Sequence, residues 1–202
     1  MYIGIDIGGT KTLVCALTNE GVIKESVKFP TPPDYEDWKF ELKKTISQLE
    51  TKEFRAGSVA VPGELDRKHG VIVMLGNLGW SNIHIVRDLE KITKCPMRVE
   101  NDAKLAGLSE AMLLKHKYKR VLYVTISTGI GIGLTVNGYI DDRIGDGAGR
   151  AMILEHQGKM QPWEVFGYGK AIVAKYGKMA SEINDKATWK QIVRTFTPGF
   201  LE

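Results

Sequence analysis

The segment Ile5-Asp6-Ile7-Gly8-Gly9-Thr10-Lys11 decides the fold that we expect for this chain. An acidic residue ends a short apolar stretch, and two glycines follow where the chain must turn. Glycine lets backbone N–H groups approach phosphate oxygens closely, while Thr10 adds a hydroxyl donor and Lys11 a positive charge. Asp6 cannot contact a phosphate favourably, so it indicates a Mg²⁺ ion held between them through water. Taken alone, the segment also fits a plain Gly-Gly hairpin.

A second glycine-rich turn lies in the later part of the chain, at Thr125-Ile126-Ser127-Thr128-Gly129-Ile130-Gly131-Ile132-Gly133. It again joins two apolar stretches through hydroxyls and glycines. An ordinary hairpin with alternating strand residues would give the same pattern. Two such turns, one opening each half of the chain, could nevertheless clamp one polyphosphate from two sides.

The hydrophobic periodicity predicts an α/β protein. Expected strands cover residues 2–6, 11–17, 22–29, 57–61, 71–75, 97–100, 120–126 and 130–136. Expected helices cover residues 35–49, 85–92, 103–114 and 163–176, with another from residue 188 onward. The first three strands form an antiparallel meander ended by prolines, after which Asp34 is placed to cap a helix. The final apolar pattern, from residue 189 to 201, is expected to stop without a packing partner.

The segment Val99-Glu100-Asn101-Asp102-Ala103 carries the candidate catalytic group. Asp102 lies where a strand becomes a helix, a position at which aspartate often serves only as an N-cap. A hydroxyl that accepts a phosphoryl group needs a positioned carboxylate to take its proton, and Asp102 could provide it. Asn101 beside it could bind a neighbouring hydroxyl.

The loop Gly76-Asn77-Leu78-Gly79-Trp80 is unusual for a mere connector. The side chain of Asn77 offers a donor and an acceptor together, which a sugar hydroxyl requires. Trp80 is expected to be a packing anchor rather than a sugar platform.

The composition excludes several classes of protein. The chain has 202 residues, of which 43% are hydrophobic and 26% charged, as in ordinary globular domains. Its net charge of +4 comes from scattered residues, and the basic run at residues 116–120 is read as a solvated helix end, so no nucleic-acid partner is expected. No apolar run approaches the ~20 residues that span a bilayer, and no secretory signal is recognisable. Cys15 and Cys95 suggest reduced thiols in a cytoplasmic protein.

Four of these motifs, together with the pair Pro62-Gly63 after an expected strand, occur in the order and rough spacing of the ROK family, which the chain resembles from residue 1 to about residue 176. The five segments are Asp6–Thr10, Pro62-Gly63, Asn77–Trp80, Glu100–Asp102 and Ser127–Gly133. The family contains sugar kinases and related repressors. The resemblance implies an actin-like ATPase (ribonuclease H-like) fold. An N-terminal lobe would occupy residues 1–116, and residues 117–202 would begin a second, incomplete lobe.

The resemblance also implies roles for individual residues. ATP and Mg²⁺ would be held by Asp6, Gly8, Gly9, Thr10, Lys11, Thr128, Gly129 and Gly131, with Asp6 reaching the metal through water. Asp102 would act as general base on a glucose-like or N-acetylated hexose. The sugar would be lined by Gly63, Asn77, Asn101 and Glu164. A homodimer is common in the family.

The chain departs from the family pattern at three points. Ala148 and Ala151 stand where a Glu and a His usually contact the sugar, and no cysteine lies between Gly158 and Glu164 to build the family's zinc site. Losing two hydrogen bonds would raise the KM for sugar about ten- to a hundredfold. His156 could replace the missing imidazole, but it is expected to be an exposed loop histidine. The family's kinases also continue beyond this length, so weak or no activity is expected of the chain.

Two other functions compete with a kinase. A degenerate protein that binds sugar or nucleotide without catalysis is favoured by Ala148 and Ala151 and opposed by Asp102. A repressor would need a DNA-binding domain ahead of the first glycine turn, and that turn begins only a few residues into this chain.

Overall fold

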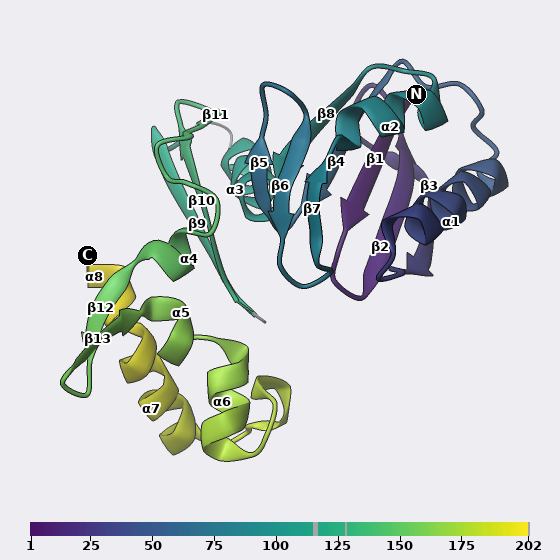
Figure 1. Ribbon diagram of the computed structural model, residues 1–202. Helices are drawn as coiled ribbons and strands as arrows, with labels where there is room; N and C mark the ends of the chain where they lie inside the picture. The colour runs from purple at the N-terminus through teal and green to yellow at the C-terminus, as the bar shows by residue number, and fades with distance from the viewer. Residues whose placement is uncertain (115–116, 128, 202) are drawn as a thin grey trace. The chain divides into compact units, whose positions relative to one another are not determined.

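The computed structural model of the protein describes residues 1–114, 117–127 and 129–201 (Figure 1). The chain divides into two compact units, Met1–Leu105 and Ala106–Glu202. The division falls within helix α3 (Asp102–Leu113), earlier in the chain than the predicted boundary between residues 116 and 117.

A five-stranded sheet of order β3-β2-β1-β4-β8 forms the centre of the first unit. Its strands are β1 (Tyr2–Ile7), β2 (Lys11–Leu17), β3 (Ile23–Pro30), β4 (Ala56–Val61) and β8 (Met97–Asn101). The first three strands pair antiparallel, and β4 and β8 continue the sheet in parallel to β1. The predicted antiparallel meander is therefore confirmed.

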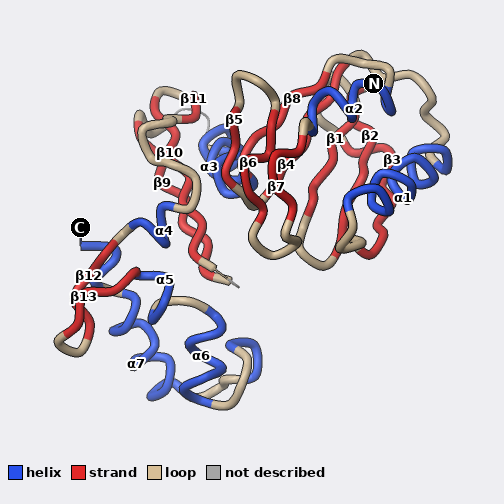
Figure 2. The backbone as a smooth tube through the Cα atoms, viewed as in Figure 1, coloured by secondary structure: helices blue, strands red, loops and turns tan. Residues whose placement is uncertain are grey.

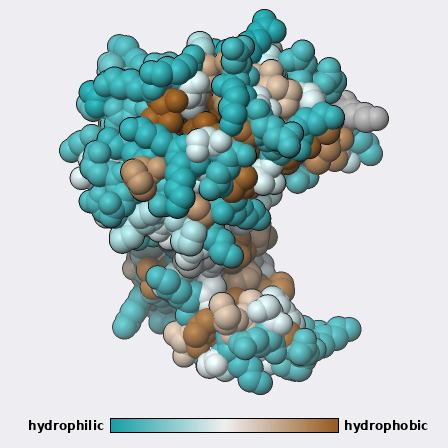
Figure 3. Space-filling view, turned by 90° about the vertical axis from the view of Figure 1, so that its right-hand side faces the viewer, coloured by the Kyte–Doolittle hydropathy of each residue, from teal (hydrophilic) through white to brown (hydrophobic). Residues whose placement is uncertain are grey.

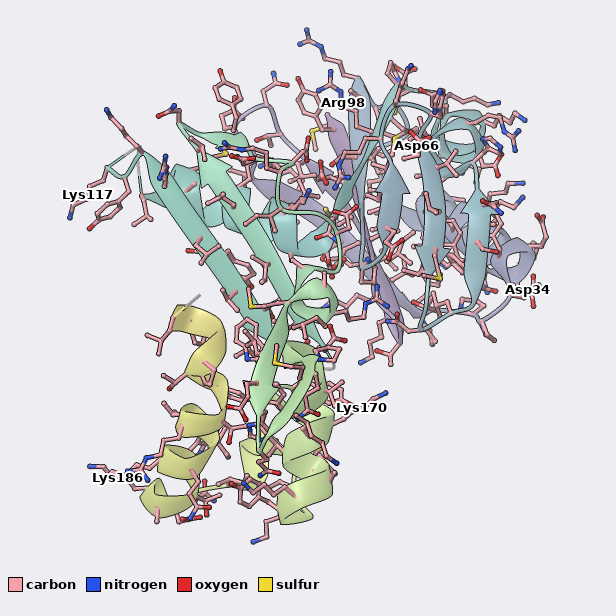
Figure 4. The ribbon with its side chains drawn as sticks, turned by 60° about the vertical axis from the view of Figure 1, so that its left-hand side comes forward. Asp34, Asp66, Arg98, Lys117, Lys170 and Lys186 are labelled. Atoms are coloured by element: carbon pink, nitrogen blue, oxygen red, sulfur yellow. The ribbon has the colours of Figure 1, made fainter. Side chains whose placement is uncertain are left out.

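One face of this sheet carries the core of the first unit. Alternation along β1 buries Ile3, Ile5 and Ile7 on that face. Helices α1 (Tyr35–Gln48) and α2 (Ile85–Thr93) add their apolar sides to the same cluster, through residues that include Trp38, Leu42, Ile85 and Leu89. Both predicted helices are confirmed. Asp34 caps α1 as expected, because its Oδ1 accepts the backbone N–H groups of Glu36 at 2.8 Å and Asp37 at 3.0 Å (Figure 4).

A smaller antiparallel sheet of order β5-β6-β7 belongs to the same unit (Figure 2). It consists of β5 (Glu64–Asp66), β6 (Val71–Leu75) and β7 (Trp80–Ile83), of which only β6 was predicted. The loop that contains Asn77 is the turn between β6 and β7. Trp80 is buried, and its ring lies 5.1 Å from the ring of Tyr35 and 5.4 Å from that of Trp38, which confirms its role as a packing anchor.

The second unit begins with a three-stranded sheet of order β11-β10-β9. Its strands are β9 (Arg120–Ile126), β10 (Ile130–Val136) and β11 (Tyr139–Ile140). The predicted bounds of β9 and β10 are confirmed. Helix α4 (Ala148–Ala151) and the hairpin β12 (Ile153–His156) and β13 (Lys159–Pro162) follow, and none of these three elements was predicted.

The single helix expected over residues 163–176 is wrong. The segment forms two helices, α5 (Trp163–Phe166) and α6 (Gly169–Tyr176). The break has a tertiary cause, since the N–H of Gly169 donates to the carbonyl of Ser127 at 2.7 Å instead of continuing the helix. A Cβ at Gly169 would come within 2.5 Å of that carbonyl oxygen, so only glycine allows this approach.

The expectation that the last apolar segment lacks a packing partner is also wrong. Helix α7 (Lys186–Phe196) buries Ile192 against Ile172 and Ile183, and 3-10 helix η1 (Ala180–Glu182) and helix α8 (Pro198–Leu201) flank it. The ring of Phe200 in α8 lies edge-on to Trp163 at 5.3 Å. The C-terminal helices are therefore part of the packed second unit.

The surface shown in Figure 3 is mainly hydrophilic, with apolar side chains in small separate areas. The charged ends of Lys170 on α6 and Lys186 on α7 extend away from their helices (Figure 4). None of the helices in the described part of the chain has the length and apolar composition needed to span a bilayer. Cys15 and Cys95 are both free thiols.

Candidate functional site

The carboxyl ends of three parallel strands gather the candidate residues of the first unit. Asp6 on β1 lies beside Ala60 on β4, which lies beside Glu100 on β8. Each strand therefore ends at the same edge of the sheet. The first glycine turn, Gly63 and Asp102 follow directly after β1, β4 and β8. Ligands of α/β proteins commonly bind outside this edge.

The first glycine turn presents an exposed tip. It is closed by a hydrogen bond from the N–H of Gly8 to the carbonyl of Lys11 at 3.0 Å, and Gly9, Thr10 and Lys11 are exposed. The side chain of Asn77 reaches this turn, because a Cβ at Gly9 would lie 2.9 Å from Asn77 Nδ2. Two sites predicted separately, the phosphate turn and the Asn77 loop, are thus adjacent.

Asp6 lies on the face of the sheet opposite to α1 and α2, where it is exposed. Partial enclosure of its carboxyl raises the pKa of Asp6, and the positive charge of Lys28 lowers that pKa by a smaller amount. A cation bound beside this carboxyl would therefore favour its charged form.

The corner between β8 and α3 holds Asn101 and Asp102 in different environments. Asn101 caps the helix, since its Oδ1 accepts the N–H of Lys104 at 3.2 Å, so the cap that was considered for Asp102 belongs to its neighbour. The Nδ2 of buried Asn101 donates to the carbonyl of Gly63 at 3.4 Å. Asp102 is half-buried, and its Oδ1 accepts the N–H of Ala103 at 2.8 Å. The corner joins three of the predicted residues.

An ion pair supports this corner from the small sheet. Arg67, which follows β5, donates from Nε to both oxygens of Glu100 at 2.9 and 3.0 Å and from Nη2 to Oε1 at 2.5 Å. The same Oε1 accepts the N–H of Asn101 at 2.7 Å. The pair links the sheet that carries the Asn77 loop to the strand that presents Asp102. Sequence reasoning missed Arg67 because nothing in its local pattern signals a partner on β8.

The second unit brings together two further predicted residues. A Cβ at Gly129 would lie 3.0 Å from Oε1 of Glu164, so the carboxylate of α5 lies against the second glycine turn. Gly131 lies on β10, half-buried. Thr128, predicted to hold phosphate, lies outside the described residues.

The two alanines that replace the family's Glu and His have different surroundings. Ala148 packs against the core around Ile130 and Trp163, whereas Ala151 is exposed.

His156 is not the exposed loop residue that was expected. It ends β12, is half-buried, and its ring stacks on that of Phe166 at 4.2 Å with an interplanar angle of 2°. Among residues 1–114, 117–127 and 129–201, no group of three or more His, Cys, Asp or Glu side chains is arranged to hold a metal ion.

Curated sugar kinases share sequence with the chain. It is 33% identical over 144 residues to an N-acetyl-D-glucosamine kinase of Haemophilus influenzae, an alignment that covers 69% of this chain and 47% of the relative. It is 29% identical over 150 residues to a glucokinase of Halalkalibacterium halodurans, covering 69% and 45%. The chain thus spans about half the length of these relatives.

Solved structures of the same kind share the fold. A ROK hexokinase from Thermus thermophilus superposes with a TM-score of 0.75 at 25% identity, covering 96% of this chain and 73% of that one. A ROK glucokinase from Streptomyces griseus, solved with glucose and AMPPNP, gives 0.72 at 25%, covering 86% and 59%. The fold is therefore that of the actin-like ATPases. The sequence pattern of the ROK family matches residues 2–197, and the chain belongs to that family.

Proposed function

We propose that the protein transfers the terminal phosphoryl group of Mg·ATP to a hydroxyl of a hexose. The observation that carries this proposal is the shared sheet edge in the first unit, where the glycine turn, Asn77 and the Asn101–Asp102 corner all lie. The N-acetyl-D-glucosamine kinase and glucokinase among the relatives support a hexose as acceptor.

The proposed roles follow from the chemistry of each group. Backbone N–H groups of the turn Gly8–Lys11 and the Lys11 ammonium would bind phosphate oxygens. Asp6 fits Mg²⁺ held through water, because it is an exposed single carboxylate and Mg²⁺ retains much of its hydration shell. When bound, this ion would neutralise charge on the phosphates. Gly129 and Gly131 are proposed as a second phosphate-binding turn.

Asp102 is the proposed general base for the sugar hydroxyl. It follows Asn101, whose side chain is held by two hydrogen bonds to the protein, so the position of the corner is well defined. Gly63, Asn77 and Asn101 of the first unit are proposed to bind the sugar, and Glu164 of the second unit is proposed separately as a sugar-binding residue. The carboxylate of Asp102 would accept the proton of the sugar hydroxyl as that hydroxyl attacks phosphorus.

Release of ADP in a coupled assay, with a panel of hexoses and N-acetylated hexosamines, tests the proposal. Asp102→Ala is expected to lower kcat by about 10²- to 10⁴-fold, since general base catalysis contributes about that much. Asp34→Ala is the matched control, because it removes an equivalent carboxylate that only caps α1. An Asp102 variant that releases ADP as fast as a measurably active wild type would refute the assigned base.

A second candidate function is sugar binding without catalysis. Ala148 favours it, because this residue packs into the core and presents no polar group to a sugar. Thermal stabilisation by a sugar, without ADP release, would support the binding protein over the kinase.

A homodimer and a cytoplasmic location are further proposals, the second supported by the two free thiols. Sedimentation velocity would test the oligomeric state.

A further inference from the structure

A chain of buried hydrogen bonds lies behind the first glycine turn. The indole Nε1 of Trp38 lies 3.0 Å from the hydroxyl of Thr12, which lies 3.0 Å from the hydroxyl of Thr31. The hydroxyl of Thr31 donates to the carbonyl of Gly8 at 2.8 Å. Trp38 and Thr12 have no exposed surface, and Thr31 is 9% exposed. This relay connects helix α1 to the turn through the interior of the first unit.

Counting hydrogens gives the relay a single direction. An indole N–H only donates, a carbonyl oxygen only accepts, and each hydroxyl has one proton. Because Thr31 uses its proton on Gly8, the proton between the two hydroxyls belongs to Thr12. Thr12 then accepts from Trp38, and every group in the relay is satisfied.

Thr31 holds the turn at two points. Besides the bond from its hydroxyl to Gly8, its backbone N–H donates to the carbonyl of Thr10 at 3.0 Å. Its own position is restricted by Pro30 and Pro32 on either side. Both carbonyls therefore point toward a fixed, nearly buried residue.

The orientation of these carbonyls determines that of the amides that follow. No peptide bond among the described residues is cis, so each C=O points opposite to the N–H of the next residue. The N–H groups of Gly9 and Lys11 must then point away from Thr31. Both residues are exposed, which leaves room beside the turn for a ligand.

We propose that Trp38, Thr12 and Thr31 form a buried relay that aims the N–H groups of Gly9 and Lys11 at the phosphates of the bound nucleotide. The three residues are positioning residues, since none of them would touch the nucleotide. The inference rests on the proposed function, because it assumes that this turn binds phosphate.

Thr31→Val tests the relay, because valine keeps the shape of threonine and removes the donor to Gly8. In the ¹⁵N-labelled chain, Mg²⁺ with tripolyphosphate is expected to shift the amide resonances of Gly9 and Lys11 most. The variant should bind tripolyphosphate and Mg·ATP about three- to tenfold more weakly, as expected for one lost hydrogen bond. Hydrogen exchange at the Gly8 amide, which closes the turn, should become at least about threefold faster.

Two further variants separate positioning from general destabilisation. Thr31→Ser keeps the hydroxyl and should restore affinity and Gly8 exchange. Thr93→Val removes a buried hydroxyl that bonds to Leu89 within α2, and it should change neither quantity.

Three results would decide against parts of this account. Wild-type affinity and unchanged Gly8 exchange in Thr31→Val would overturn the relay, and so would an equal loss in Thr93→Val. A wild-type chain that binds neither tripolyphosphate nor Mg·ATP would contradict the proposed function. In that case Gly8 exchange still decides whether the relay orders the turn.

Discussion

The charged carboxyl of Asp6 lowers the stability of the folded protein, although this residue has a proposed role in binding Mg²⁺. Its pKa is raised in the folded protein, mainly by loss of hydration. The folded state therefore prefers the protonated carboxyl, and this preference is fully present below about pH 4 and lost as the pH rises through the raised pKa. At neutral pH the charged side chain opposes folding.

Asp6→Asn is accordingly expected to raise the free energy of unfolding at pH 7, and this gain should disappear below about pH 4. Because Asp6 is exposed, the gain should remain under about 1 kcal/mol. Urea denaturation at the two pH values measures it, and a pH-independent difference would contradict the argument. Under the proposed function, the same variant should bind Mg·ATP more weakly.

The ion pair between Arg67 and Glu100 should couple more strongly than a surface pair. The two side chains are 27% and 17% exposed and share several hydrogen bonds, so water screens their interaction poorly. A double-mutant cycle with Arg67→Met and Glu100→Gln should give a coupling energy of about 1–2 kcal/mol.

The pair Lys44 and Glu41 on α1 provides the comparison for this cycle. Its side chains are 59% and 35% exposed and its charged atoms lie 3.5 Å apart. Its coupling energy should be about 0.3 kcal/mol. Equal coupling in the two pairs would show that the β8–α3 corner does not depend on Arg67.

At the scale of elements, close contact between strands β1 and β4 depends on Gly57. A Cβ there would lie 2.4 Å from Cγ2 of Ile3 and 2.7 Å from its carbonyl oxygen, so the two strands would have to separate. Gly57→Ala should therefore destabilise the protein by about 1–3 kcal/mol, as overpacking of a core does.

Gly76→Ala is the matched control, because a Cβ there meets no atom within 4 Å. Its effect on the free energy of unfolding should stay within about 0.5 kcal/mol. Chemical denaturation of both variants checks the pair of predictions. A neutral Gly57→Ala would mean that β1 and β4 separate without loss of stability.

At the scale of the whole molecule, the hydrophobic cores follow the division of the chain. One cluster, from Ile3 to Val99, lies entirely in the first unit, whereas the clusters around Trp163 and Ile192 lie in the second. Each unit therefore has its own source of stability.

Core substitutions should accordingly act on one unit at a time. Leu42→Ala and Ile192→Ala each remove a buried side chain and should destabilise their own unit by about 2–4 kcal/mol. Hydrogen exchange followed by mass spectrometry assigns the loss of protection to residues. If both variants accelerated exchange equally across the chain, the two units would be a single cooperative structure.

Much of the fold could be predicted because it is local. The alternation of apolar residues along β1 indicates a strand, and the glycines at residues 8 and 9 indicate a turn. The helical spacing of the apolar residues in α1 marks the side of that helix that is buried.

Only the tertiary structure decided which distant segments of the chain are in contact. The features that it decided include the break at Gly169, the packing of Ile192, the bond from Asn101 to the carbonyl of Gly63 and the relay through Thr31. A period in the sequence shows which side of an element is buried, but it does not name the partner. That partner depends on register and on packing among all the elements, which no short stretch of sequence contains.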